Sequence, residues 1–260
     1  MRFRWRNSMF QIFNLKNNPN VRVLEEAGPF TVIEHQRDQS VEPSQAQNAY
    51  FASEMNIRRR QLICDLSKSP VTIQPGDMQW MVGDVEATTG VKGISDFFGK
   101  AVRGKVTGES AIKPEYSGSG VVVCEPTYRH VLLINPSEWG NGVVLDDGLF
   151  LACDSGIRHR TVARTNLSSA LAGNEGLFNL CLEGNGTAAL ECSVPKEEIV
   201  EVRLQNDVLK VDGNFAIAWS ESLNFTVERA GKSLLGSAVS DEGLVNVYRG
   251  SGQIWLAPLK

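Results

Sequence analysis

The chain has 260 residues, of which 42% are hydrophobic and 22% charged, and this ordinary globular composition excludes disorder over its whole length. The net charge of -4 argues against general coating of nucleic acid, which needs an excess of Lys and Arg. No apolar run approaches the roughly 20 residues that a membrane-spanning helix needs.

The first 24 residues carry several Arg and Lys side chains and no acid, which is typical of an organelle presequence. Arg2–Arg6, however, alternates charged and aromatic residues with the period of a strand. We therefore expect an N-terminal strand or arm rather than a cleaved presequence. The aromatic and cationic side chains of Met1–Lys16 would allow this arm to contact an acidic membrane surface.

A β-hairpin is predicted next, because Val21–Leu24 and Phe30–Ile33 flank the turn dipeptide Gly28-Pro29. Residues 36–48 are polar and rich in Gln, Ser and Asn, and they are predicted to form a linker. Residues 1–48 are thus interpreted as an arm, a hairpin and a linker, followed by a single β domain over residues 49–260.

An internal repeat dominates the rest of the chain. Glycines at 118, 184 and 250 each begin a Gly-x-Gly triplet, and they are spaced 66 residues apart. The repeat predicts three β-units, at about 54–119, 120–185 and 186–252, followed by a closing strand at 253–259. We expect an all-β barrel with pseudo-threefold symmetry, in which the closing strand pairs with the beginning of the first unit and removes the exposed edges.

Glycines at equivalent positions of the repeat are predicted to form turns, because glycine adopts positive φ without steric cost. Three of them follow a polar residue or proline between two apolar strands: Gly76, Gly148 and Gly213. The others belong to the Gly-x-Gly triplets: Gly118, Gly120, Gly184, Gly186, Gly250 and Gly252.

The five cysteines form no Cys-x-x-Cys pair, and their odd number and wide spacing predict buried, reduced thiols. A reducing compartment follows, with the cytoplasm as the expected location and the mitochondrion as the alternative. The three histidines, His35, His130 and His159, are too scattered for a metal site. Nucleophile and phosphate-loop motifs are also missing, so we predict no catalytic residue, metal or cofactor.

Two basic clusters remain as candidate contacts for an anion or a single-stranded nucleic acid: Arg58, Arg59 and Arg60, and Arg158 with Arg160. Trp80 and Trp139 lie in the same broad regions and would supply stacking surfaces. The alternative is an edge strand that charge protects from aggregation. The acidic net charge makes nucleic-acid binding the less favoured interpretation.

The repeated Glu-Gly-Leu-x-Asn sequences at 175–179 and 242–246, the downstream Gly-x-Gly triplets and the ending Gly250–Pro258 resemble the altered-inheritance-of-mitochondria family. That family belongs to the superfamily of proteins like the tryptophan RNA-binding attenuator protein (TRAP-like). The resemblance covers about residues 50–259 and implies β-repeats similar to a double-stranded β-helix. It supplies no catalytic or ligand-binding residue that can be placed on this chain.

The residues shared by the repeats are all explained by folding. We therefore expect a non-enzymatic scaffold or protein-interaction module that forms homo-oligomers and binds protein partners. The alternative is a β-barrel that binds a small ligand or a single-stranded nucleic acid, with its pocket at the barrel mouth or along the arginine-rich strands.

Overall fold

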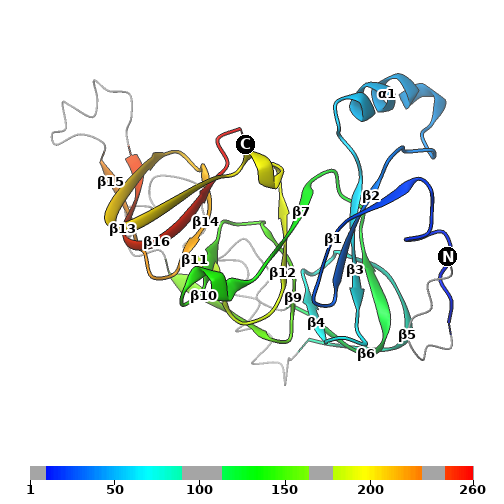
Figure 1. Cartoon of the computed structure of the whole chain (residues 1–260), viewed down its shortest axis with the longest axis horizontal. Coiled ribbons are helices and arrows are strands. Elements are labelled where there is room, and N and C mark those ends of the chain that lie inside the picture. Colours follow the sequence, from blue (N-terminus) through cyan, green and yellow to red (C-terminus); the bar gives the residue numbers. More distant parts are fainter. Residues whose placement is uncertain (1–9, 90–112, 164–177, 230–243, 260) are drawn as a thin grey trace.

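The computed structural model describes residues 10–89, 113–163, 178–229 and 244–259. Within these residues the chain is mostly β, and its strands form two antiparallel, barrel-like sheets with one short α-helix. Figure 1 shows most of the N-terminal strands on its right side and most of the C-terminal strands on its left. The all-β prediction is confirmed, whereas the count of three repeats stays a prediction.

The first sheet contains nine strands of the described residues, in the order β1-β2-β3-β6-β4-β9-β12-β7, with β5 paired to β6. Its strands are β1 (Val21–Ala27), β2 (Phe30–His35), β3 (Arg60–Asp65), β4 (Val71–Ile73), β5 (Met78–Thr88), β6 (Glu115–Cys124), β7 (His130–Ile134), β9 (Phe150–Asp154) and β12 (Ala188–Cys192). Strands that follow each other in the chain are thus not always neighbours in the sheet. For example, β4 pairs with β9, and β12 lies between β7 and β9.

The second sheet contains seven strands of the described residues, in the order β10-β11-β8-β14-β16-β13, with β15 paired to β16. Its strands are β8 (Val143–Leu145), β10 (Ile157–Ala163), β11 (Phe178–Gly184), β13 (Val200–Asp212), β14 (Ala216–Ser220), β15 (Asn224–Arg229) and β16 (Leu244–Leu256). Three short 3-10 helices connect elements of both sheets: η1 (Pro43–Gln45), η2 (Pro136–Trp139) and η3 (Lys196–Glu198).

The predicted closing strand is the end of β16, and its predicted partner is wrong. Residues 253–256 pair with β13 and β14 inside the second sheet. They do not reach β3, the first strand of the repeat region. Both edges of β3 are already filled, by β2 on one side and β6 on the other. The N-terminal hairpin thus occupies the edge that the closing strand would have needed.

The hairpin prediction is confirmed, since β1 and β2 pair around Gly28-Pro29. Described residues of the arm pack on the same sheet, with Phe10, Ile12 and Leu15 against the buried residues of its outer face. The predicted strand at Arg2–Arg6 and most of the proposed membrane-contacting arm lie outside the described residues. The predicted linker at 36–48 differs from the structure at its end, because η1 and the first residues of α1 (Ala46–Glu54) lie there.

Glycines at 66-residue spacing share one backbone conformation. Gly118, Gly184 and Gly250 have φ of 114°, 114° and 121°. The sequence predicted turns at these three glycines, and this prediction is wrong. Gly118 and Gly250 lie inside long strands, and Gly184 ends β11. Gly120 and Gly252 also lie in strands, whereas Gly186 follows β11 in a bend. At Gly118 and Gly184 the physical reason is close approach, since an added Cβ would lie 2.2 Å from the Asp84 carbonyl oxygen and 2.3 Å from the Gly156 carbonyl oxygen. At Gly250 the nearest atoms would be 3.8 Å away, so the positive φ alone favours glycine there.

Gly76, Gly148 and Gly213 do lie between successive strands, with φ of 98°, 76° and 66°. This left-handed region favours glycine. Each of them lies in a short connection, between β4 and β5, β8 and β9, or β13 and β14.

One hydrophobic cluster joins the two sheets. It contains side chains from β7, β9 and β12 of the first sheet and from β8, β11, β14 and β16 of the second. Trp139 and Trp255 meet edge to face in it, with ring centroids 5.0 Å apart. In β3, Leu62 and Cys64 join one cluster and Ile63 another, as expected for alternate faces of a strand. All five cysteines are buried and none forms a disulfide, as predicted.

Candidate functional site

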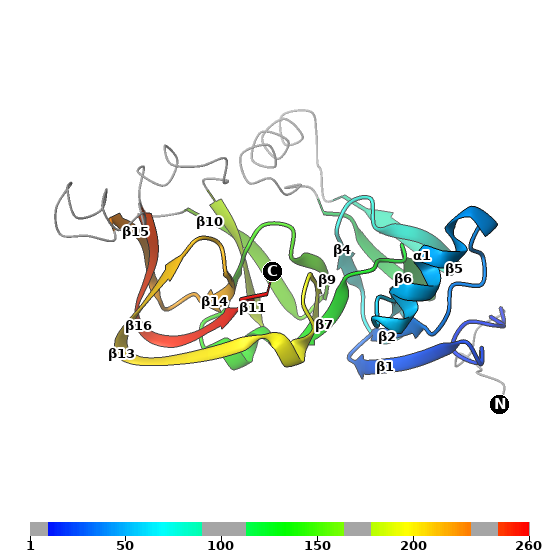
Figure 2. The ribbon, with the colours of Figure 1, turned by 90° about the horizontal axis from the view of Figure 1, so that it is seen from above.

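The α-helix α1 projects from the body of the protein. None of its nine residues, all in the described part of the chain, is buried. The helix stands apart from the sheets at the upper right of Figure 1, and Figure 2 shows it above the first sheet. Isolated helices of fewer than about 12 residues are marginal in water, so α1 needs support from its surroundings or from a partner.

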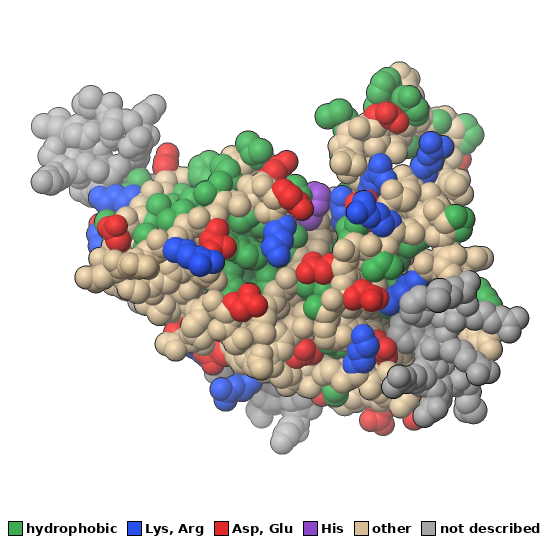
Figure 3. Space-filling model, in the orientation of Figure 1, with side chains coloured by type: hydrophobic (Ala, Val, Ile, Leu, Met, Phe, Trp, Pro, Cys, Tyr) green, Lys and Arg blue, Asp and Glu red, His purple; other side chains and the backbone are tan. Residues whose placement is uncertain are grey.

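Large apolar side chains cover the outer side of this projection. Tyr50, Phe51, Met55 and Ile57 are 61%, 57%, 74% and 51% exposed, and we call them the α1 apolar surface. Phe51 and Met55 are four residues apart, which places them on one side of the helix. Figure 3 shows hydrophobic side chains at the tip of the projection and Lys or Arg side chains at its base.

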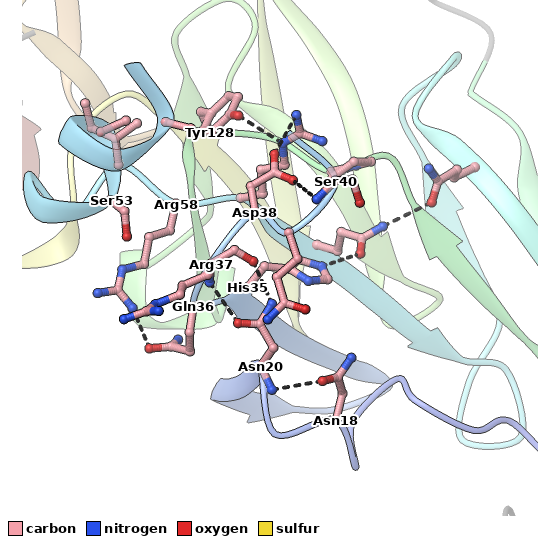
Figure 4. A pocket seen from close by; sticks show the side chains of 18 residues that line it. Asn18, Asn20, His35, Gln36, Arg37, Asp38, Ser40, Ser53, Arg58 and Tyr128 are labelled. Carbon is pink, nitrogen blue, oxygen red and sulfur yellow. Dashed lines mark hydrogen bonds and ion pairs between the residues drawn. The ribbon is translucent and has the colours of Figure 1, made fainter. Parts of the chain in front are cut away.

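The opposite side of α1 carries small residues and forms one wall of a cleft of about 380 Å³. Ala49, Ala52 and Ser53 contribute this wall, while the segment that follows β2 and the residues before β3 contribute others. We call this feature the arginine cleft, because three arginines and a single aspartate line it: Arg37, Arg58, Arg59 and Asp38. Figure 4 shows Arg37, Arg58 and Asp38 around the cleft.

A hydrogen-bonded network of side chains adjoins the cleft. Gln61 donates from Nε2 to the Cys124 carbonyl oxygen at 3.0 Å and to Gln79 Oε1 at 3.1 Å. Its Oε1 lies 2.9 Å from His35 Nε2. Because an amide oxygen only accepts, His35 donates from Nε2 to Gln61 Oε1. The network supplies polar groups beside the cleft, whose arginines and Asp38 carry charge.

The structure brings the first predicted basic cluster to this cleft but gives its members different roles. Arg59 pairs with Asp38 at 3.0 Å and donates from Nε to the Tyr128 hydroxyl at 3.0 Å. That hydrogen bond, followed by the carboxylate, raises the pKa of Arg59. Arg58 donates from Nη1 to Gln36 Oε1, and it has no ion pair within the described residues.

Arg60 is unavailable to an external anion, so its prediction as a contact is wrong. It is 5% exposed and pairs with Glu34, with Nη2 2.8 Å from Oε2. Its Nη1 faces the carbonyl oxygens of Arg58, Tyr128 and Arg129 at 3.3–3.5 Å. The strand places this side chain inward, where it holds the loop before β7 to β3.

The second predicted basic cluster lies elsewhere, on β10 of the other sheet. Arg158 is exposed, while Arg160 forms ion pairs with Glu183 and Glu221. Trp139 is 3% exposed and belongs to the core, so it offers no stacking surface. The two clusters therefore do not form one nucleic-acid track, and binding by either of them stays a prediction.

Sequence reasoning missed both α1 and Arg37. The signal for the helix was present, because Tyr50, Phe51, Met55 and Ile57 concentrate four large apolar residues in a polar stretch. Arg37 lies within the segment interpreted as a linker. Nothing local indicates that it lies at the same cleft as Arg58, since only the β2–β3 pairing brings them together.

A smaller hollow of about 190 Å³ lies elsewhere and is lined by three acids, Asp77, Glu125 and Glu191. Burial, then the Glu191 carboxylate, raise the pKa of Asp77 to about 6, against the opposing effect of Lys113. The Glu191 carboxylate accepts a hydrogen bond from Thr127 Oγ1 at 2.5 Å. Asp77 is therefore a half-buried carboxylate that the fold holds at a free-energy cost when it is ionised.

This cost predicts a pH-dependent effect of Asp77→Asn. The folded state binds the Asp77 proton more tightly than the unfolded state, so wild-type stability falls as the pH rises from about 4 to about 6. The substitution should raise the free energy of unfolding by about 1 kcal/mol at pH 8, after allowance for solvent screening. Below about pH 4 it should change nothing. Urea unfolding at both pH values measures the difference, and an equal effect at both would contradict this origin.

The described residues contain no group of three or more His, Cys, Asp or Glu side chains arranged to hold a metal ion. Among those same residues, no helix has the length and apolarity needed to cross a bilayer.

A known family model matches most of this all-β chain. The family model described as mitochondrial biogenesis AIM24 matches residues 53–259. The chain belongs to the AIM24 family, as its resemblance predicted.

Two relatives from Streptococcus pyogenes show the extent of the similarity. An uncharacterised protein of the serotype M6 strain is 28% identical over 197 residues, which cover 73% of this chain and 77% of that protein. The crystal structure of another S. pyogenes protein superimposes with a TM-score of 0.55 at 24% identity, and the match covers 77% of this chain and 88% of that one. At this identity the crystal structure supports the fold alone.

Proposed function

We propose that this AIM24-family protein is a non-enzymatic protein-interaction scaffold that self-associates through the α1 apolar surface. The observation that carries the proposal is that α1 buries none of its residues while it exposes four large apolar side chains at its tip and end. Exposed apolar patches of this kind mark interaction sites in soluble proteins. Buried cysteines without a disulfide fit a reducing compartment, with the cytoplasm proposed first and the mitochondrion second.

A second copy of the chain is the partner that this surface fits. Between residues 46 and 57 the only charged side chain is Glu54, so two copies of the surface meet with little repulsion. An isologous contact about a twofold axis needs such a self-complementary patch. It would also supply the packing that a nine-residue helix lacks on its own.

Polar substitutions on α1 are expected to weaken the association. The double variant Phe51→Ser/Met55→Ser removes the two apolar side chains that share one side of the helix. We expect its dissociation constant for self-association to rise at least about 100-fold, since hot-spot residues each contribute about 2 kcal/mol or more. Sedimentation velocity over a range of concentrations measures this shift.

The matched control is Val208→Ser, which exchanges another exposed apolar residue, on β13 (43% exposed). It should associate as the wild type does. A wild-type chain that remains monomeric at all concentrations, or a control that is as impaired as the double variant, would refute the proposal.

A further inference from the structure

The arginine cleft carries a feature that self-association does not use. Arg37 and Arg58 line it without an ion pair to any described residue, while the one acid of the cleft, Asp38, is engaged by Arg59. The cleft thus holds two uncompensated positive charges in a chain whose net charge is -4. Two guanidinium groups that line one concave site without an ion pair repel each other, and an anion between them would relieve this repulsion.

The hydrogen bonds of Arg58 also favour an anion in the cleft. Its Nη1 donates to Gln36 Oε1 at 2.5 Å, but its Nε is buried and has no acceptor among the described residues. A buried donor without an acceptor is rare in native proteins. Among the described residues Arg60 Nε is in the same state, but Arg60 does not line the cleft, whereas Arg58 does. An oxyanion supplies acceptors that match the planar donor fork of a guanidinium.

The surrounding groups suit a small polar ligand. Asn18 and Asn20 lie on one side of the cleft, and Ser40 and Ser53 line it as well. Asn20 is held in place because it donates to the Arg37 carbonyl oxygen at 2.6 Å and accepts from the Arg37 amide at 2.9 Å. This pair of hydrogen bonds fixes the backbone that carries the Arg37 side chain. Figure 4 shows Arg37 and Arg58 extending toward the same side of the cleft.

We infer that the arginine cleft binds a compact oxyanion, a phosphate or carboxylate group, between Arg37 and Arg58. The cleft volume of about 380 Å³ accommodates more than a bare ion. The group is therefore part of a larger molecule, either a free phosphorylated or carboxylated compound or an acidic side chain of a bound segment.

Isothermal titration calorimetry of the full-length chain with three probes tests this inference: inorganic phosphate, citrate and a hexapeptide of glutamate. We expect at least one probe to bind, with an affinity that falls as salt is added. Tighter binding of phosphate or citrate identifies a free ligand, and tighter binding of the peptide identifies an acidic segment. No binding of any probe at up to about 10 mM would overturn the inference.

Variants of the two arginines assign the site. Arg58→Gln and Arg37→Gln should each weaken binding at least about tenfold, as expected when a charge-assisted hydrogen bond is lost. Arg58→Lys keeps the charge but loses the planar fork, so it should bind with intermediate affinity. Arg158→Gln removes an exposed arginine of β10 and should bind as the wild type does.

Unchanged affinity in Arg37→Gln would overturn the inference even if an Arg58 variant failed to fold, because the exposed Arg37 side chain has no role in the core. The outcome is separable from the self-association, because none of these substitutions touches the α1 apolar surface.

Discussion

Replacing Arg60 with methionine is expected to lower the free energy of unfolding by about 3–5 kcal/mol, the usual effect of breaking a buried ion pair. Arg60 and Glu34 are 5% and 8% exposed, and their charged groups lie 2.8 Å apart. Methionine fills similar space, but it leaves the Glu34 carboxylate buried without its cation. It also removes the donors that face three carbonyl oxygens around β3 and β7. Urea unfolding at neutral pH measures the loss.

Two further variants separate the buried charge from the change in shape. Arg60→Met combined with Glu34→Leu removes both charges, so we expect it to recover most of the loss. Arg160→Met breaks two ion pairs at the surface, where each contributes about 1 kcal/mol or less. An equal loss of unfolding free energy in Arg60→Met and Arg160→Met would contradict the larger contribution assigned to the buried ion pair.

Replacing Gly118 with alanine is expected to lower the free energy of unfolding by at least about 3 kcal/mol, from backbone strain and steric overlap together. Gly118 has a φ of +114°, which alanine rarely adopts, and its added Cβ would lie 2.2 Å from the Asp84 carbonyl oxygen. Because that oxygen belongs to the paired strand β5, the overlap can be relieved only by separating β5 from β6. Thermal and urea unfolding of the variant measure the effect.

Gly76→Ala is the matched control, because Gly76 has a φ of +98° but no atom within 4 Å of the added Cβ. It should lose only about 1–2 kcal/mol, the strain of the backbone alone. Gly184→Ala should behave like Gly118→Ala, since its Cβ would lie 2.3 Å from the Gly156 carbonyl oxygen. Equal losses at Gly76 and Gly118 would contradict the role assigned to close strand approach.

Features with a local cause were predictable from the sequence. The hairpin around Gly28-Pro29 follows from turn residues between two apolar runs. The buried thiols follow from the number and spacing of the cysteines. The 66-residue spacing also marked positions of shared conformation, since Gly118, Gly184 and Gly250 have nearly the same φ. It did not show that these glycines lie in paired strands, because close approach depends on the neighbouring strand.

Features set by the choice of strand partner were not predictable. An apolar strand at 253–257 can pair with any free strand edge. The sequence does not indicate that β2 already occupies the edge of β3. The arginine cleft was hidden for the same reason. Its residues come from the arm, the segment after β2, α1, and strands β3 and β5. Only the folded sheet brings them together. The tripeptide Arg58-Arg59-Arg60 looked uniform, but each residue faces a different environment.

Tyr50, Phe51 and Met55 of the α1 apolar surface lie on the side of the helix away from the arginine cleft, whereas Ile57, which follows the helix, also lines the cleft. The projection therefore has two surfaces of different chemistry. The outer side presents large apolar residues, while the inner side presents small residues to a cationic cleft. A ligand in the cleft would contact the wall that α1 forms. The same short helix therefore lies between the site proposed for an anion and the surface proposed for a second copy.

Site-specific cross-linking tests the self-association through α1 most directly. The five native cysteines are buried, so Met55→Cys introduces a single accessible thiol at the most exposed residue of the α1 apolar surface. Under mild oxidation we expect this variant to form a covalent dimer, because we place the twofold axis of the contact beside Met55. Val208→Cys, with its thiol on β13, should stay mostly monomeric. Equal, slow cross-linking of the two variants would contradict the proposed role of α1.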